Sequence, residues 1–141
     1  MADKATSRCF CGAVEVEVTG EPVLQGYCHC NDCRAWSGTP VTAYALWPED
    51  KVRVTGGEDA LRAYSKNGTT VRQFCGTCGG AVMTASTGVG LVDVYPMTID
   101  GFRFEPRAHI DYELRIVDMK DGLPKFRGRP VPGGANETMD E

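Results

Sequence analysis

Seven cysteines fall into three closely spaced groups, and their spacing is typical of metal ligands. The groups are Cys9-x-Cys11, Cys28-x-Cys30-x-x-Cys33 and Cys75-x-x-Cys78. Thiolates are soft ligands that suit zinc, and a structural zinc is almost always four-coordinate. The odd count, in a chain whose first residues lack the apolar stretch of an export signal, disfavours a disulfide framework. Metal binding or thiol chemistry is therefore the predicted use of these cysteines.

The simplest partition of seven ligands gives two zinc ions per chain. The two short groups together make a closed structural site from Cys9, Cys11, Cys75 and Cys78. Glycines beside the last of these suit a tight knuckle, because glycine tolerates left-handed backbone angles. The remaining thiolates can hold a second zinc with its fourth position free, the mark of a catalytic site. That predicted catalytic set is Cys28, Cys30 and Cys33.

The charge of the three-thiolate site predicts which ligand it takes. Three thiolates and one Zn²⁺ leave one net negative charge, and thiolates donate electron density to the metal. Such a zinc is a poor Lewis acid, so a soft thiol is a better fourth ligand than water. A bound thiol would be held as thiolate at neutral pH, below the ~8.5 pKa of a free cysteine. Thiol activation is favoured over hydrolysis.

Other interpretations of the same residues stay open. The triple group could hold a second structural zinc closed by His29, His109 or an acidic side chain. Cys30 and Cys33 could form a CxxC redox pair, although the βαβ pattern of a thioredoxin-like fold is missing. Candidates for orienting a substrate, chosen for charge or hydroxyl groups near the ligands, are Arg34, Ser37 and Arg72.

The elements expected to position these groups are mostly short strands. Valines alternate with glutamates over residues 14–18, which is the period of a half-buried strand. Further strands are expected over residues 23–27, 41–47, 51–55, 61–64, 70–74, 81–85, 91–95 and 109–112. A hairpin turn is expected at Asn67-Gly68. One helical turn is expected over residues 34–38, capped by Asn31 or Asp32.

Composition limits the class of protein. The length of 141 residues fits one domain, expected over residues 8–129 between a flexible start (1–7) and a disordered tail (130–141). The net charge of −4 argues against nucleic acid as a partner. No stretch approaches the ~18–20 apolar residues of a membrane span, so no membrane partner is expected. Without an export signal, the expected location is the cytoplasm. The sequence does not define the oligomeric state.

Four motifs together resemble a known family. They are CxCGAV from Cys9, CHCxxCR followed by SG from Cys28, FCxxCG from Phe74, and a late HI…DGLPKF that ends at Phe126. This combination is similar to the glutathione-dependent formaldehyde-activating enzyme family, whose domain is shared with centromere protein V. The resemblance covers residues 9–126. It implies a mainly β, Mss4-like fold of packed antiparallel sheets with zinc knuckles, and the same division of the cysteines into a structural and a catalytic site.

The resemblance also implies an activity. The family's name-giving reaction adds glutathione to formaldehyde, so we expect a carbon–sulfur lyase of the S-(hydroxymethyl)glutathione synthase type. The expected partners are a small thiol such as glutathione and a small aldehyde, with two zinc ions as cofactors. The alternative is a non-catalytic zinc module that binds a small thiol or a protein partner.

Overall fold

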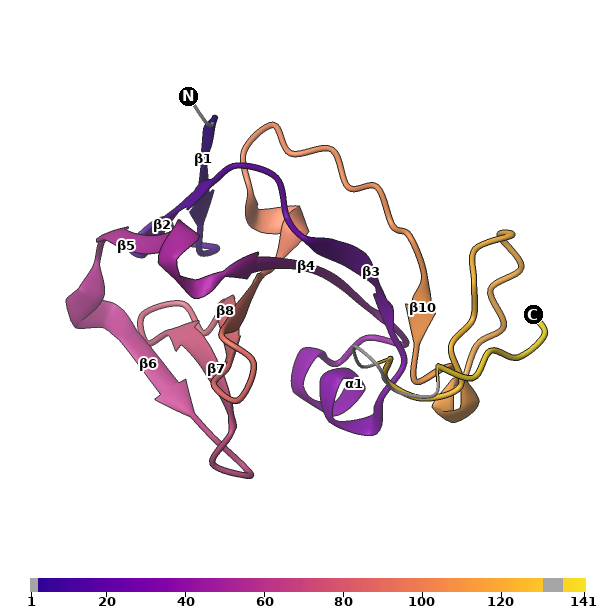
Figure 1. Cartoon of the computed structure of the whole chain (residues 1–141). Helices are drawn as coiled ribbons and strands as arrows, with labels where there is room; N and C mark the ends of the chain where they lie inside the picture. Colours follow the sequence, from indigo (N-terminus) through magenta and orange to yellow (C-terminus); the bar gives the residue numbers. More distant parts are fainter. Residues whose placement is uncertain (1–2, 131–135) are drawn as a thin grey trace. The chain divides into compact units, whose positions relative to one another are not determined.

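The protein is built mainly from β-strands. The computed structural model describes residues 3–130 and 136–141 (Figure 1). The strands are β1 (Lys4–Arg8), β2 (Glu15–Thr19), β3 (Leu24–Cys28), β4 (Thr42–Pro48), β5 (Val52–Gly56), β6 (Leu61–Tyr64), β7 (Thr70–Cys75), β8 (Ala81–Ser86), β9 (Leu91–Val94) and β10 (His109–Ile110). The described helices are α1 (Asn31–Ser37) and the 3-10 turns η1 (Glu49–Lys51), η2 (Glu58–Ala60), η3 (Pro96–Thr98) and η4 (Tyr112–Leu114). The predicted mainly β class is confirmed.

The chain forms two compact units. The first comprises Met1–Leu24 and Ala45–Phe104, and the second comprises Gln25–Tyr44 and Glu105–Glu141. Each unit contains one of the two cysteine clusters. The single domain expected over residues 8–129 stays a prediction.

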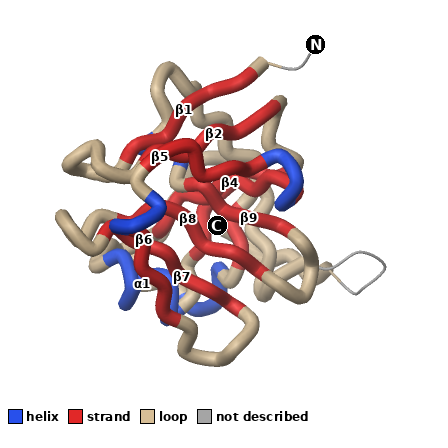
Figure 2. The backbone as a smooth tube through the Cα atoms, turned by 90° about the vertical axis from the view of Figure 1, so that its left-hand side faces the viewer, coloured by secondary structure: helices blue, strands red, loops and turns tan. Residues whose placement is uncertain are grey.

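Two antiparallel sheets make up the first unit. One has the order β1-β2-β5, with the valines of β2 buried and its glutamates facing outward. In the other, the end of β4 pairs with β9, followed by β8, β7 and β6. Figure 2 shows β6, β7, β8 and β9 side by side. These pairings follow from the period-2 pattern of the sequence, which gives each strand one apolar face.

The core of the first unit lies between these sheets. Val14, Val16 and Val18 are buried in one cluster with Val82 and residues of β4 and β9. Burial of such a side chain contributes roughly 1.5–3 kcal/mol. The loop that leads from β1 to β2 is held closely: a Cβ on Gly57, whose φ is +75°, would lie 1.8 Å from the carbonyl oxygen of Ala13. Only glycine fits at residue 57, so the loop that carries Cys9 and Cys11 packs directly against the backbone there.

In the second unit, β3 leads directly into the metal-binding segment. It pairs in parallel with β10, so that Tyr27 lies opposite His109 and Cys28 lies opposite Ile110. Helix α1 follows, and its N-cap is Cys30, whose sulfur accepts the N–H of Cys33 at 3.2 Å. The sequence-based cap at Asn31 or Asp32 was therefore wrong, because a thiol group takes the place of the usual oxygen acceptor.

Both ends of the chain differ from the sequence-based expectation. The segment expected to be flexible over residues 1–7 contains most of β1, which pairs with β2 along its whole length. In the tail expected to be disordered, Thr138 bridges to Phe126 and the N–H of Met139 donates to the Lys125 carbonyl at 2.8 Å. The parts of those two predictions that concern residues 1–2 and 131–135 lie outside the described residues.

Helices long and apolar enough to cross a membrane are absent from the described part of the chain.

A titratable side chain interrupts the apolar pattern of the first unit. Asp93 in β9 lies opposite Thr84 and Leu46, and its carboxyl group accepts the N–H of Ala45 at 3.1 Å. Burial raises the pKa of Asp93 to about 7, against the opposing effects of the Ala45 N–H and the charge of Arg72. The folded protein therefore holds a proton on this group that the unfolded chain releases near pH 3.8.

We expect Asp93→Asn to remove a pH dependence of stability. Because the pKa of Asp93 is higher in the folded state, its contribution to stability is present at pH 4 and lost as the pH rises through about 7. Urea unfolding should be measured for Asp93→Asn and the wild type at several pH values. The free energy of unfolding of the variant minus that of the wild type should increase from pH 5 to pH 8. Asp59→Asn, at an exposed position of the same unit, is the control. Parallel pH profiles for both variants would contradict the assignment.

Two candidate metal centres

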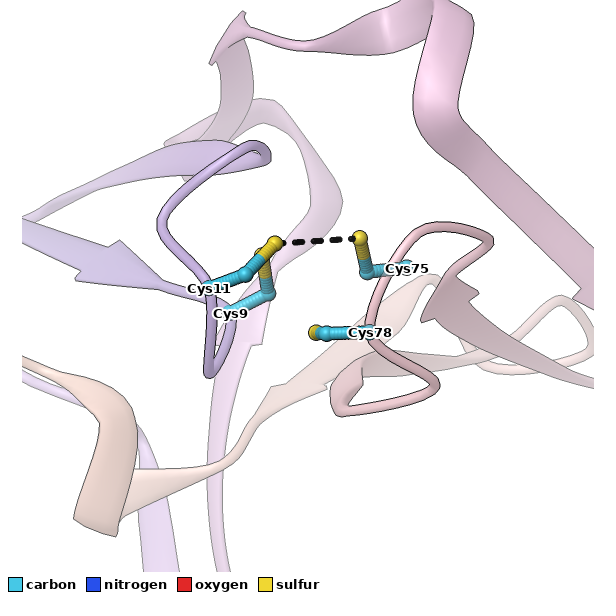
Figure 3. A group of neighbouring side chains, drawn as sticks. All are labelled: Cys9, Cys11, Cys75 and Cys78. Carbon is cyan, nitrogen blue, oxygen red and sulfur yellow. Dashed lines mark hydrogen bonds between the residues drawn. The ribbon is translucent and has the colours of Figure 1, made fainter.

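The first candidate centre brings together the two short cysteine groups. Cys9 and Cys11 lie in the tight turn after β1, Cys75 ends β7, and Cys78 lies in the turn that follows, as Figure 3 shows. The four sulfurs all lie within 4.8 Å of one another. Adjacent pairs are separated by 3.7 Å (Cys9 to Cys11) and 3.8 Å (Cys11 to Cys75). These cysteines are 64 residues apart in sequence, so the fold itself assembles the cluster.

The spacing of these sulfurs fits a tetrahedral zinc ion. With Zn–S bonds of ~2.3 Å, the edges of a tetrahedron of sulfurs are about 3.8 Å long. The measured sulfur separations match that length, and the donor set is the soft one that zinc prefers. Four soft donors leave no position for a further ligand, so the residues suit a closed structural site. Cys9 and Cys75 are buried, Cys11 is exposed, and none of the four is in a disulfide.

Backbone amides surround this cluster and favour thiolates. The N–H groups of Val14, Thr77 and Gly80 donate to the sulfurs of Cys9, Cys75 and Cys78 at 3.2, 3.3 and 3.3 Å. The backbone N–H groups of residues 78 and 77 lower the pKa of the Cys75 thiol to about 6.

The same cluster cannot ionise fully without a cation. The Ala13 N–H opposes a higher pKa at Cys11, but desolvation and the neighbouring sulfurs outweigh it and raise that pKa to about 11. A divalent ion would release the remaining proton, as thiolate metal sites do.

The second candidate centre is formed by Cys28, Cys30 and Cys33. Cys28 ends β3, Cys30 caps α1, and Cys33 lies in the first turn of that helix. Their sulfurs also lie within 4.8 Å of one another. Cys28 is buried, whereas the other two are half-buried, so this cluster has an accessible side. Three soft donors with an accessible side suit a metal that keeps one position for a further ligand.

A charged pair that the sequence did not reveal lies beside this second cluster. The carboxylate of Asp111 lies 3.9 Å from the Cys28 sulfur, and the Arg129 guanidinium lies 3.8 Å from it. Arg129 also donates to the Asp111 carboxylate at 3.1 Å. Asp111 has a φ of 53°, the one positive φ at a non-glycine among the described residues. Such backbone strain is found where the surrounding structure requires a particular side-chain position.

The thiols of the second cluster share their protons unequally. Hydrogen bonds with the neighbouring thiols raise the pKa of Cys28 and lower the pKa of Cys30. Desolvation favours loss of the Arg129 proton, but the Cys28 and Asp111 charges outweigh it and raise the Arg129 pKa. The metal-free cluster therefore holds protons that a bound cation would displace.

The three candidate substrate contacts have different surroundings. Arg34 in α1 donates from Nε to the His29 carbonyl and from Nη2 to the Leu114 carbonyl, both at 3.1 Å, and also to the Asn31 side chain. Ser37 exchanges a hydrogen bond with the Thr39 hydroxyl at 2.6 Å. A shallow hollow beside α1 includes Arg34 among its lining residues. Arg72 lies in β7, in the first unit. Roles for these three residues remain predictions.

The missed residues come from distant parts of the chain. Asp111 and Arg129 are 83 and 101 residues from Cys28, and neither has a cysteine nearby in sequence. The signal that could have found Asp111 is the late HI…DGLPKF motif, because that residue directly follows its first two residues.

Comparison with known proteins supports one family. The family model described as "Glutathione-dependent formaldehyde-activating enzyme" matches residues 4–113. A Schizosaccharomyces pombe protein described as an uncharacterized lyase is 25% identical over 132 residues, which cover 93% of this chain and 91% of that protein. A Talaromyces marneffei protein, provisionally named a glutathione-dependent formaldehyde-activating enzyme, is 33% identical over 73 residues; these cover 50% of this chain and 39% of that protein.

A solved structure also resembles this chain. The crystal structure of a Rhodobacter sphaeroides protein matches it with a TM-score of 0.59 and 26% sequence identity. The match covers 70% of this chain and 90% of the other. The Mss4-like fold class predicted from the motifs agrees with this likeness.

We expect the two cysteine clusters to respond differently to mutation. Elemental analysis of the wild type should find two zinc ions per chain. The variants Cys75→Ser and Cys28→Ser should each contain one. Cys75→Ser should also lower the thermal stability strongly, because a closed zinc site contributes binding energy of about 10–16 kcal/mol to folding. Cys28→Ser should leave the protein folded with the first zinc bound. Equal loss of stability in both variants, or one zinc in the wild type, would contradict the two-site assignment.

Proposed function

We propose that this chain, which belongs to the glutathione-dependent formaldehyde-activating enzyme family, joins a small thiol to a small aldehyde at the three-cysteine cluster. Glutathione and formaldehyde are the proposed pair, and S-(hydroxymethyl)glutathione is the product, as for a carbon–sulfur lyase acting in the synthetic direction. The observation that carries this proposal is the accessible set of three sulfurs beside a guanidinium. The names of the relatives support the reaction class.

Cys28, Cys30 and Cys33 would hold the zinc ion of this site. When bound, zinc supplies stabilisation of a fourth ligand in its thiolate form. Three cysteine thiolates already outweigh the charge of the ion, so the site favours a soft, polarisable ligand over hydroxide. The second zinc, held by the four-cysteine cluster, is proposed to have a structural role only.

Arg129 is proposed to adjust the charge beside the cluster. Its guanidinium contacts both the Cys28 sulfur and the Asp111 carboxylate, at 3.8 and 3.1 Å. A fixed positive charge at this distance stabilises an incoming thiolate, and Asp111 restricts the guanidinium to one side of the cluster. Candidates for binding the rest of the substrate are Arg34 and Ser37 of the same unit; a role for Arg72, which lies in the first unit, stays a prediction from the sequence.

The proposed reaction forms one carbon–sulfur bond. The substrate sulfur donates an electron pair to the aldehyde carbon, and the π electrons of the C=O bond move to its oxygen. The proton that the thiol lost on binding is returned, through water, to that oxygen. Atoms and charge therefore balance without an oxidant or reductant.

Exchange NMR of formaldehyde with glutathione tests the proposed reaction. At equal thiol concentration, the protein should increase the exchange rate between free and glutathione-bound formaldehyde. Cys33→Ser should abolish the increase while the four-cysteine site keeps its zinc. Absence of any increase with the zinc-loaded wild type would reject this reaction and favour the alternative, a non-catalytic zinc module that binds a small thiol or a protein partner.

We also expect Arg129→Gln to weaken binding of the thiol. Without the guanidinium, the Asp111 carboxylate is unpaired 3.9 Å from Cys28 and repels an incoming thiolate. The expected effect is an increase of about tenfold in the KM for glutathione, equivalent to ~1.4 kcal/mol, with a smaller change in kcat. Arg107→Gln, which removes an exposed guanidinium of the same unit, is the matched control. An unchanged KM would contradict the role of Arg129.

A further inference from the structure

Four large polar or aromatic side chains are fully buried in the second unit, outside the cysteine cluster. His29, His109 and Tyr112 have no exposed surface, and Lys125 is 2% exposed. Burial of imidazoles and an ammonium group is costly unless each finds partners. These residues belong to the CHC segment and to the late HI…DGLPKF segment, for which the proposed reaction gives no role.

The buried groups and two exposed carboxylates, Asp121 and Glu141, form one continuous chain of hydrogen bonds. His29 Nε2 lies 2.8 Å from His109 Nδ1, and His109 Nε2 lies 2.7 Å from Asp121 Oδ2. The Lys125 ammonium donates to Asp121 Oδ1 at 2.6 Å and to a carboxylate oxygen of Glu141 at 3.2 Å. Tyr112 packs edge-on against both imidazoles, with ring centroids 4.9 and 5.4 Å away.

The hydrogen atoms in this chain have one consistent order. Burial opposes ionisation of Asp121, but the Lys125 ammonium and the His109 ring N–H outweigh it and lower its pKa, so the carboxylate only accepts. A neutral His109 must therefore carry its hydrogen on Nε2 and accept on Nδ1. It follows that His29 donates from Nε2. Its own Nδ1 is buried without a hydrogen-bond partner among the described residues, as expected for a bare lone pair.

His29 is also the link to the cysteine cluster. It lies between Cys28 and Cys30, and its backbone N–H donates to the Ile110 carbonyl at 3.1 Å. Its carbonyl accepts Arg34 Nε at 3.1 Å. With the ring held by His109, the side chain, N–H and carbonyl of His29 are all fixed. The two sulfurs on either side of it are thereby held in place.

We infer that the His29–His109–Asp121–Lys125 chain is a positioning network that sets the geometry and metal affinity of the three-cysteine site. Asp121 and Lys125 fix the tautomer of His109, which fixes His29 and hence Cys28 and Cys30. Glu141 anchors the outer end of the chain through Lys125 and through the Gly122 N–H at 3.0 Å. The inference concerns metal binding and does not depend on which thiol or aldehyde reacts.

Asp121→Asn tests the order of hydrogens directly. Lys125 can only donate, so the amide oxygen must face it and the amide N–H₂ must face His109. His109 then accepts on Nε2 and donates from Nδ1 to His29, whose hydrogen moves to its own buried Nδ1. Both histidines should therefore change from the Nε2–H to the Nδ1–H tautomer. The protein has only two histidines, so imidazole ¹⁵N chemical shifts report both without ambiguity.

The same variant tests the coupling to the metal. With cadmium-113 in both sites, the Asp121→Asn change should shift or broaden the three-cysteine resonance and leave the four-cysteine resonance unchanged. Chelator competition should show about 10–100-fold weaker binding at the three-cysteine site only, the usual effect of losing a hydrogen-bond partner behind a ligand. Glu113→Gln makes the same carboxylate-to-amide change at an exposed pair of this unit and should change neither readout.

Several results would overturn the inference. One is an Nδ1–H tautomer at either histidine of the wild type, a test that needs no variant. Another is a change of both histidines to the Nδ1–H tautomer in Asp121→Asn while the metal affinity of the three-cysteine site stays unchanged. If Asp121→Asn does not fold, His109→Gln should retain the second metal, because its amide can accept from His29 and donate to Asp121, whereas His109→Leu should lose it. Equal affinities in those two variants would reject the network.

Discussion

The mutual repulsion of clustered thiolates is the constraint on which the rest of this structure depends. Four sulfurs in the first unit and three in the second are each gathered within 4.8 Å. Such a group cannot hold all its negative charges in a protein interior without a cation, because like charges at this distance raise one another's pKa. The opposite pKa changes within each cluster, upward at Cys11 and Cys28 and downward at Cys75 and Cys30, express this competition. The fold thus assembles two clusters that could each hold a metal ion.

The two cysteine clusters are surrounded by different kinds of polar group. Around the four-cysteine cluster, the groups that contact sulfur are backbone amides from tight turns, which offer partial charge and no chemistry of their own. Around the three-cysteine cluster, contacts include the ionised side chains of Asp111 and Arg129. Amides suit a permanent site, whereas side-chain charges can respond to an arriving ligand. This difference supports the proposal that the first cluster stabilises the fold and that the second carries the reaction.

Much of this arrangement could be predicted from local sequence patterns. Each predicted strand corresponds to an observed one within a few residues, because the valine and glutamate alternation and the glycine turns act locally. The grouping of cysteines within each short run was also predictable, since short spacings bring neighbouring sulfurs together. The N-cap of α1 was not, because a cysteine side chain seldom fills that position. Pairing of β1 and the bridge from Thr138 to Phe126 depend on partners far along the chain.

The residues that sequence reasoning missed share a physical reason for being missed. Asp111, Arg129 and Asp121 are ordinary surface-type residues by composition, and only the three-dimensional structure places them beside a thiol or a buried imidazole. His29 shows the converse case. Its place between two ligands predicts a ring directed away from the metal, and the structure adds what that ring contacts. Because Cys28 ends β3 and Cys30 caps α1, His29 occupies the short link between the two ligands. A histidine at this position can be held by hydrogen bonds that lead through His109 to the Asp121 carboxylate, whereas an apolar side chain could not.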